Sequence, residues 1–113
     1  VHVVPFQVSH PNFITHKKVT ASCVCLLAGE VAPALTGKIV LIENADPGFD
    51  WIFAQQIGGL ITKYGGANSH MAIRCAEFGI PAAIGCGEQR FEVFMNANQI
   101  LLDCAAGLIN PLH

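Results

Sequence analysis

The sequence predicts a single mixed α/β domain, and three observations support this. Its 113 residues are enough for one domain with a buried core but not for two. It is 52% hydrophobic and only 12% charged, which indicates a compact and strongly buried fold. Short apolar runs typical of strands alternate with helical patterns along the chain, which is the order of a layered α/β domain. One domain covering residues 1–113 is therefore expected.

The first third of the chain is predicted to contain two buried strands. The first dozen residues, which include Pro5 and Pro11, are interpreted as an edge strand or as a linker leading into the domain. Val19–Leu27 is apolar and β-branched with little alternation, as in a strand covered on both faces. Lys38–Ile42, "KIVLI", is a second such run, and it lies between Gly37 and the turn-rich "ENADPG".

A short amphipathic helix is predicted next, within "FDWIFAQQIGG". Its apolar positions are Trp51, Ile52, Phe53 and Ile57. Gly58 and Gly59 are expected to end it. The strand Leu60–Thr62 then leads directly to a pair of glycines.

A second helix follows the glycine pair, in "SHMAIRCAEF". Asn68 is a favoured N-cap residue, Gly79 is a favoured residue just past a helix end, and Pro81 follows two positions later. The remaining elements are predicted to be strands at Pro81–Gly85 and Gln99–Asp103, a turn at "CAAG", and a last strand from Leu108.

Charge and hydropathy exclude some classes of function. Six Lys and Arg against eight Asp and Glu give a net charge of -2, and the basic residues do not cluster. Binding to nucleic acid or to an anionic membrane is therefore poorly supported. No apolar run reaches the roughly 18 residues of a spanning helix, and no signal peptide is evident, so a cytoplasmic protein is expected. Because the chain begins with Val1, we expect it to be a piece of a larger multidomain protein.

The five cysteines do not suggest a disulfide framework or a metal site. They are odd in number, they form no CxxC pair, and each lies in an apolar neighbourhood. Buried free thiols in a reducing compartment are therefore expected, and no metal ligands are assigned.

His70 is the candidate functional residue. Gly65 and Gly66 permit positive φ, so the chain can turn sharply off the preceding strand. With Asn68 as the cap, His70 occupies the second helical position, near unpaired N–H groups and the positive end of the helix dipole. Such a place favours an anion beside a neutral imidazole, and phosphate is the anion most often held there. A histidine that accepts a phosphoryl group is one interpretation; a surface histidine, or one that only bonds a neighbour, is the other.

The stretch "GGLITKYGGANSHMAIRCAEFGIPAAIG" resembles the phosphohistidine swivelling domain of the phosphoenolpyruvate-utilising enzymes. This family includes pyruvate phosphate dikinase and phosphoenolpyruvate synthase. The positions that match its pattern are Gly65, Gly66, Asn68, Ser69, His70, Ala72, Ile73, Glu77, Gly79, Ile80, Pro81 and Ala82. The similarity extends from about Glu43 to Gly87. It implies a layered β/β/α swivelling fold, with a glycine loop that leads into the helix carrying His70.

The chain departs from the family pattern beside the histidine. The family's arginine six residues after the histidine is Ala76 here, and an aliphatic position is Arg74. Arg74 and Glu77 fall on the helix face of His70, whereas position 76 does not. Arg74 could therefore pair with a phosphate on His70 or form a salt bridge with Glu77. Met71 replaces a small residue, which we interpret as a packing change.

The resemblance implies a phosphoryl-carrier domain of a kinase-type phosphotransferase that is inactive in isolation. His70 would accept and donate the group, with Gly65, Gly66, Asn68, Ser69 and Arg74 as candidates for binding or positioning the phosphate. The expected partners are an ATP-grasp-like nucleotide-binding domain and a domain for phosphoenolpyruvate or pyruvate in the same protein. Mg²⁺ and ATP would bind to those partner domains and no cofactor to this one.

Two other functions stay open at this point. A degenerate swivelling domain would bind or regulate without carrying phosphate, which the altered arginine position permits. An unrelated metal or redox protein built on the cysteines is the weaker alternative.

Overall fold

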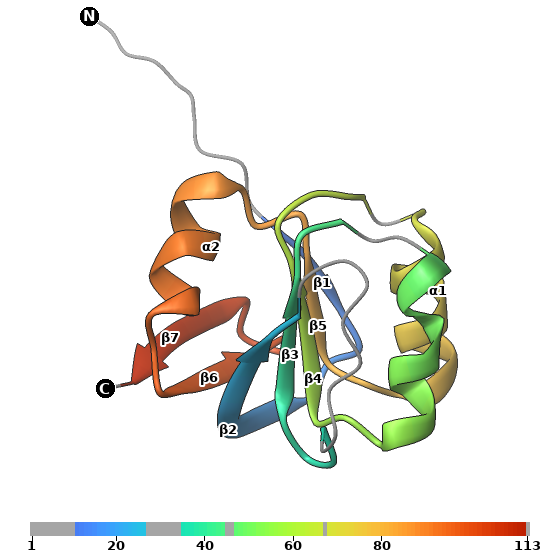
Figure 1. The fold of residues 1–113 in the computed structure, drawn as a ribbon, viewed down its shortest axis with the longest axis horizontal. Helices are drawn as coiled ribbons and strands as arrows, with labels where there is room; N and C mark the ends of the chain where they lie inside the picture. Colours follow the sequence, from blue (N-terminus) through green and yellow to red (C-terminus); the bar gives the residue numbers. More distant parts are fainter. Residues whose placement is uncertain (1–10, 27–34, 45–46, 67, 113) are drawn as a thin grey trace, which may run out of the picture.

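The computed structural model describes residues 11–26, 35–44, 47–66 and 68–112. These residues form a mixed α/β fold around one curled sheet, with helices on both of its faces (Figure 1). The elements in chain order are β1 (Asn12–Ile14), β2 (Lys18–Cys25), β3 (Ile39–Ile42), the 3₁₀ helix η1 (Pro47–Gln55), β4 (Gly59–Thr62), α1 (His70–Phe78), β5 (Ala82–Ile84), α2 (Glu88–Met95), β6 (Gln99–Asp103) and β7 (Leu108–Leu112).

The sheet has the strand order β1-β5-β4-β3-β2-β6-β7. Strands β2, β3, β4 and β5 run parallel, and β1 pairs antiparallel with β5 at one edge. The hairpin of β6 and β7 continues the sheet antiparallel from β2. The prediction of an edge strand or linker over the first dozen residues lies mostly outside the described part of the chain, which omits residues 1–10. The edge strand β1 begins at Asn12, at the end of that range.

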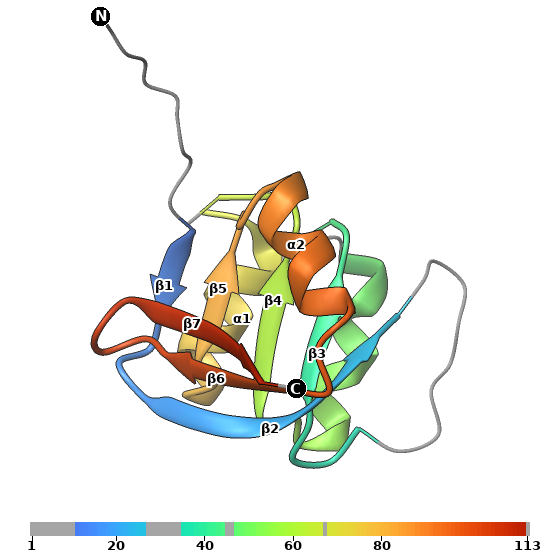
Figure 2. The same ribbon diagram turned by 90° about the vertical axis from the view of Figure 1, so that its left-hand side faces the viewer.

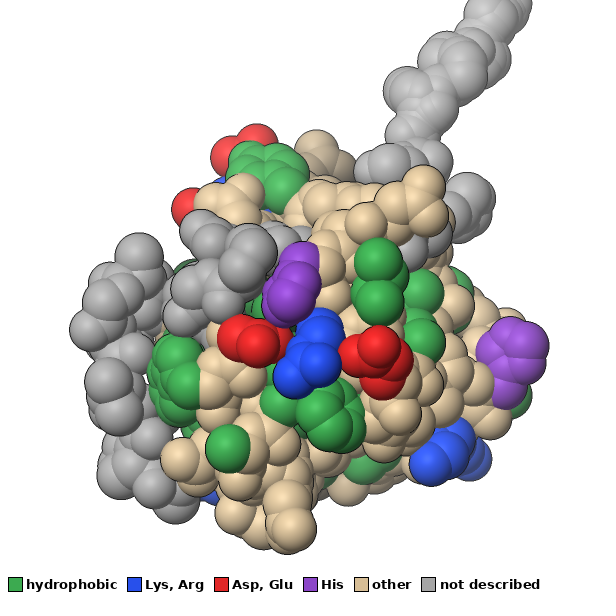
Figure 3. All heavy atoms as spheres, turned by 90° about the vertical axis from the view of Figure 1, so that its right-hand side faces the viewer, with side chains coloured by type: hydrophobic (Ala, Val, Ile, Leu, Met, Phe, Trp, Pro, Cys, Tyr) green, Lys and Arg blue, Asp and Glu red, His purple; other side chains and the backbone are tan. Residues whose placement is uncertain are grey.

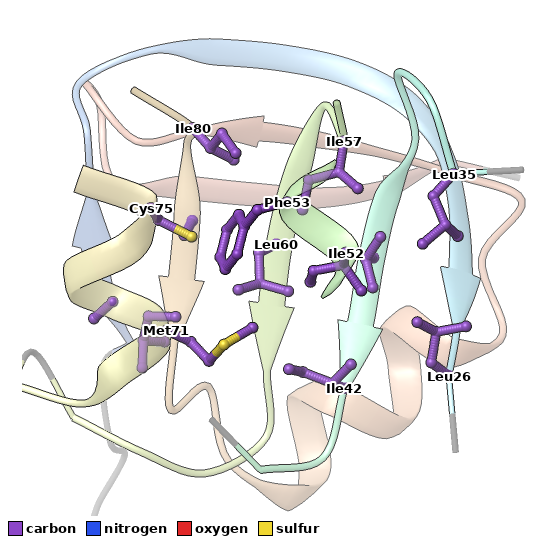
Figure 4. Packing of buried hydrophobic residues seen from close by; sticks show 14 residues of the cluster. Leu26, Leu35, Ile42, Ile52, Phe53, Ile57, Leu60, Met71, Cys75 and Ile80 are labelled. Atoms are coloured by element: carbon purple, nitrogen blue, oxygen red, sulfur yellow. The ribbon is translucent and has the colours of Figure 1, made fainter. Parts of the chain in front are cut away.

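Two hydrophobic clusters fill the two faces of the sheet. All residues of β3 and β4 are buried. Burial was predicted for "KIVLI", whereas "LIT" was predicted as a strand only. Their side chains alternate, so that Val40 and Leu60 face η1 and α1, whereas Leu41 and Ile61 belong to the cluster of α2 and β6. Figure 4 shows the first cluster, in which Met71 is fully buried and reaches toward Leu60.

Strand β2 differs from its prediction as a strand covered on both faces. Lys18, Thr20 and Ser22 are exposed, and the residues between them are half-buried. The strand pairs with β6 over its first part and with β3 over Cys23–Cys25, so it crosses from the hairpin to the parallel strands (Figure 2). Over the first part only one face meets the core, which explains the alternation.

The glycines after η1 do not end it. The 3₁₀ helix stops at Gln55, and Gln56 takes a positive φ of 57°. Gly58 and Gly59 instead allow close approach: a Cβ on Gly58 would lie 2.6 Å from the carbonyl oxygen of Gly37, and one on Gly59 would lie 3.3 Å from Ile39. The predicted helix is therefore present, but as a tighter 3₁₀ helix with a different end.

Helix α2 was absent from the sequence prediction. Most of its residues are polar or exposed, and only Phe91 and Phe94 are buried. These two aromatic rings, three residues apart, pack on Leu41, Ile61 and their neighbours in the second cluster. The helix covers the face of the sheet that η1 and α1 leave open (Figure 1).

We predict that Phe91→Ala lowers the free energy of unfolding by about 3–5 kcal/mol, because it leaves a cavity between α2 and the sheet. Phe91 is 3% exposed. Val93→Ala, at a position that is 51% exposed on the same helix, is the matched control and is expected to change it by less than about 1 kcal/mol. Urea unfolding measures both. Equal losses in the two variants would show that α2 does not cover the core.

Candidate functional site

His70 is the first residue of α1. Ser69 is the N-cap: it has extended backbone angles, and its Oγ accepts a hydrogen bond from the Ala72 N–H at 3.4 Å. The prediction that Asn68 caps the helix is wrong, and Asn68 is exposed one residue before the cap. Both residue types cap helices well, and Ser69 has the extended conformation that the position requires. His70 is thus one position nearer to the positive helix end than expected.

The other end of α1 follows the prediction. Gly79 adopts a left-handed conformation with a φ of 68°, and its N–H bonds the carbonyl of Ala76 at 3.3 Å. This is the favoured way to end a helix at glycine. The next residues lead directly into β5, which lies against β4. The helix that carries His70 is therefore fixed at both ends by local sequence signals.

Only one of the two glycines before His70 needs to be glycine for its φ. Gly65 has a φ of 122°, whereas Gly66 lies outside the left-handed region. The carbonyl of Gly66 accepts a hydrogen bond from the Ser69 N–H at 3.0 Å, which closes the turn into the helix. A Cβ on Gly66 would meet nothing within 4 Å, so the site leaves room beside the backbone there.

The buried hydroxyl of Thr62 ties this loop to the end of β5. Thr62 is fully buried at the end of β4; its Oγ1 accepts from the Gly85 N–H at 2.9 Å and donates to the Tyr64 carbonyl at 2.8 Å. Gly85 has a φ of 77°, and a Cβ there would overlap the carbonyl oxygen of Gly65. The path of the glycine loop is therefore set by contacts with a second loop.

Asp50 is the site residue that sequence reasoning missed. Its Oδ1 lies 3.0 Å from Nε2 of His70 and 3.2 Å from Nε of Arg74. Asp50 belongs to η1, which packs beside α1 on the same face of the sheet (Figure 1). Histidine, carboxylate and arginine side chains adjoin one another on the face shown in Figure 3. The signal in the sequence was an acidic residue within the helix predicted just before the glycine loop.

The hydrogen bond from His70 lowers the pKa of Asp50 below its usual value of 3.8, and the charge of Arg74 acts in the same direction. Asp50 is therefore ionised at neutral pH, and an ionised carboxylate only accepts hydrogen bonds. It follows that Nε2 of His70 carries a proton in this arrangement, and that Nδ1 holds the lone pair of the neutral ring.

Arg74 is held by two carboxylates and two aromatic rings. Besides Asp50, it donates through Nη1 to Oε1 of Glu77 at 3.2 Å, which is the salt bridge that the sequence left as one alternative. Its guanidinium also lies 4.8 Å from the ring centre of Phe78, which stacks on Phe53. Ala76, where the family has its arginine, is exposed and takes no part in this group. Arg74 thus shares the carboxylate of Asp50 with His70 without occupying the family's arginine position.

An open groove of about 460 Å³ lies next to this group. Phe53 and Phe78 form part of its wall, so they separate the groove from Arg74. Lys17 and Lys18 lie at the same groove, and His70, Asp50 and Arg74 do not line it. The groove therefore adjoins the histidine site but is not part of it.

The five cysteines are free thiols in the structure. Burial raises the pKa of Cys75 to about 12 and that of Cys86 and Cys104 to about 11, so these three are protonated at neutral pH. Across the described ranges, no group of three or more His, Cys, Asp or Glu side chains could hold a metal ion. In the same ranges, no helix is long and apolar enough to cross a membrane.

Comparison with known families gives a match over residues 34–107 to the mobile domain of PEP-utilising enzymes. The chain belongs to this family. The matched region of this mobile domain includes η1, the glycine loop and α1, and so contains Asp50, His70 and Arg74.

Curated relatives of this mobile domain are much longer proteins. Phosphoenolpyruvate synthase of Neisseria meningitidis is 30% identical over 71% of this chain and 10% of its own length. The Escherichia coli phosphoenolpyruvate synthase is 31% identical over 63% of this chain and 9% of its own. Rifampicin phosphotransferase of Bacillus cereus is 32% identical over 67% of this chain and 8% of its own. The chain thus spans about a tenth of the length of these relatives.

A solved structure shares the fold of this mobile domain. The solution NMR structure of a UPF0107 protein superposes with a TM-score of 0.67 and covers 93% of this chain and 98% of its own. The two sequences are only 10% identical, so this likeness concerns the fold alone.

We predict that Gly85→Ala destabilises the chain by about 1–3 kcal/mol more than Gly37→Ala. Both glycines have a positive φ, of 77° and 74°, so both variants lose about 1–2 kcal/mol from backbone strain. Only at Gly85 does the new methyl group overlap the carbonyl oxygen of Gly65, because nothing lies within 4 Å of a Cβ on Gly37. Urea unfolding of the two variants measures the difference, and equal losses would contradict the loop contact.

The Asp50 contact also predicts a pH dependence of stability. Because the pKa of Asp50 is lowered in the folded state, the stabilisation is fully present above about pH 3.8 and is lost as the pH falls through the folded-state value. Wild type should be more stable than Asp50→Asn at pH 6, and the two should converge at acid pH. Urea unfolding from pH 6 to pH 2.5 tests this, with Glu92→Gln on α2 as the charge-matched control. A difference that persists unchanged at pH 2.5 would contradict it.

Proposed function

We propose that this chain is the phosphoryl-carrier domain of a phosphotransferase like phosphoenolpyruvate synthase or pyruvate phosphate dikinase, and that His70 carries the group. The observation that carries the proposal is the place of His70: it opens α1 behind the glycine loop, within the stretch that matches the mobile domain. A phosphoryl group on the ring would lie at the positive helix end, with Arg74 beside it.

In the carrier step a phosphoryl group passes from an oxygen atom of the donor to a ring nitrogen of His70. A lone pair on a neutral ring nitrogen of His70 attacks phosphorus, the bond from phosphorus to the donor oxygen breaks, and the ring proton leaves to solvent. The reverse step passes the group to the acceptor. Gly65, Gly66, Asn68 and Ser69 shape the backbone around the group, and Arg74 supplies positive charge.

The partners follow from the family. We propose that this is one layered β/β/α swivelling domain of a larger cytoplasmic protein, with an ATP-grasp-like domain and a phosphoenolpyruvate- or pyruvate-binding domain in the same chain. Mg²⁺ and ATP are assigned to those partners. Tyr64, Ile73 and Phe78 are exposed on the loop and helix around His70, at 47%, 50% and 51%, and form the docking face we assign to them.

A degenerate domain with a binding or regulatory role is the second candidate. The observation that favours it is the exchange of the family's arginine for Ala76, together with the pairing of Arg74 to Asp50 and Glu77. In that case no phosphoryl group would be attached to His70.

The deciding experiment uses the full-length protein with labelled ATP or phosphoenolpyruvate. We expect an acid-labile, base-stable phosphate on wild type and its complete loss in His70→Ala, because that change removes the proposed nucleophile. His16→Ala, at an exposed histidine before β2, is the matched control and should label like wild type. Labelling that persists in His70→Ala contradicts the carrier function; no labelling of wild type supports the degenerate domain.

A further inference from the structure

We infer that Asp50 is a placeholder for the phosphoryl group: its carboxylate occupies the place beside Nε2 and Arg74 that a phosphoryl on His70 takes, and phosphorylation displaces it. This inference rests on the proposed carrier function. It adds a positioning residue outside α1.

The argument begins with one oxygen atom that two donors share. Oδ1 of Asp50 accepts from Nε2 of His70 at 3.0 Å and from Nε of Arg74 at 3.2 Å. Oxygen atoms of a phosphoryl group accept hydrogen bonds from the same kinds of donor. Arg74 therefore lies on the Nε2 side of the ring, and a phosphoryl group bonded to Nε2 gains its positive charge.

The two groups exclude each other in space and in charge. A phosphorus atom bonded to Nε2 would lie along the direction now taken by the hydrogen bond to Oδ1, well inside contact distance of that oxygen. A carboxylate beside a phosphoryl dianion is also a like-charge pair. Phosphorylation at Nε2 therefore requires that Asp50 move away from both His70 and Arg74.

Displacement is feasible because the contact lies at the surface. The side chains of Asp50 and His70 are each 41% exposed, and that of Arg74 is 34% exposed. Arg74 keeps its contacts with Glu77 and Phe78 when Asp50 leaves, so it stays close to Nε2. Arg74 then exchanges the Asp50 carboxylate for the phosphoryl group as its partner, and α1, which carries His70 and Arg74, does not need to move.

Glu77 provides a matched comparison within the same group. It is a carboxylate that also pairs with Arg74, at 3.2 Å, whereas the polar partner of His70 among the described residues is Asp50. Removing its charge frees Arg74 in part but does not uncover Nε2. Variants of Asp50 and of Glu77 thus separate two effects: Asp50 covers Nε2 of His70 and neutralises Arg74, whereas Glu77 only neutralises Arg74.

The test phosphorylates the chain chemically with potassium phosphoramidate at low salt and follows His70 by ³¹P and ¹H–¹⁵N NMR. Once Asp50 has moved away, the ring proton passes through solvent from Nε2 to Nδ1, which leaves the lone pair on Nε2. The N–P bond then forms at Nε2 as the P–N bond of phosphoramidate breaks, and the ring proton leaves within the ammonium ion. We expect Asp50→Asn to react about fivefold faster than wild type, as expected for one charge near 4 Å in water. Glu77→Gln should change the rate less than about twofold, and the remote variant Glu92→Gln should match wild type. In 1 M salt the advantage of Asp50→Asn should shrink.

Several results would overturn the inference. These are equal rates for Asp50→Asn and wild type, an equal gain in Glu77→Gln, or attachment of the phosphoryl group to Nδ1.

A titration with inorganic phosphate tests the competition without covalent chemistry: Asp50→Asn should shift the Arg74 Nε–H signal at about fivefold lower phosphate than wild type. Suppose that no variant is phosphorylated but Asp50→Asn still binds inorganic phosphate more tightly than wild type. The proposed carrier function then fails, whereas the competition between Asp50 and phosphate for Arg74 is supported. If the titration shows no difference, the inference fails.

Discussion

The position of the histidine depends on the close contact of two loops, one after β4 and one after β5. The carbonyl oxygen of Gly65 lies where a side chain on Gly85 would be, and the buried hydroxyl of Thr62 bonds the backbone of both loops. A buried hydroxyl is stable only with its partners satisfied, so the two loops are held in one arrangement. From there the chain reaches Ser69 and starts α1 with His70. The position of the His70 side chain is thus set by backbone contacts rather than by side-chain packing.

The parallel order of the central strands explains why Asp50 meets His70. Strands β3 and β4 are adjacent and parallel, and each is followed by a helix on the same face of the sheet. The two helices therefore begin near the same edge of the sheet, where the carboxyl ends of both strands lie. Asp50 is in the first half of η1 and His70 at the start of α1, twenty positions apart in sequence but within 3.0 Å in space. The topology brings them together.

The elements that the sequence predicted well are those with strong local signals. Short apolar runs identified β3 and β4, and Gly79 with Pro81 identified the end of α1. Helix α2 was missed because only Phe91 and Phe94 mark its buried face, and eight residues are too few for a clear period. The predicted burial of β2 was wrong because its change of pairing partner, from β6 to β3, is not indicated by any local sequence pattern.

The residues of the site likewise fall into those with a local sequence signal and one that depends on tertiary contact. Gly65, Ser69, His70 and Arg74 lie within ten positions of one another, so helix geometry and the glycine signal placed them approximately. Whether Asn68 or Ser69 forms the cap depends on one set of backbone angles, which propensity cannot resolve between two good caps. Asp50 comes from another element, and its role depends on tertiary contact. The sequence shows only an acidic residue within a predicted helix, and it does not indicate which residue that carboxylate contacts.

Arg74 lies beside Asp50 and His70 from a different position on α1 than the family's arginine. Position 74 is one turn after His70, so its side chain returns to the same face, whereas a side chain at position 76 points well round the helix. The stack on Phe78 and the pair with Glu77 already order the long Arg74 side chain. Much of the conformational entropy of that side chain, about 2 kcal/mol, is thus lost before any anion arrives. A preordered arginine binds an incoming anion at lower entropic cost than a free one, and the two exposed neighbours that order it lie on α1 itself.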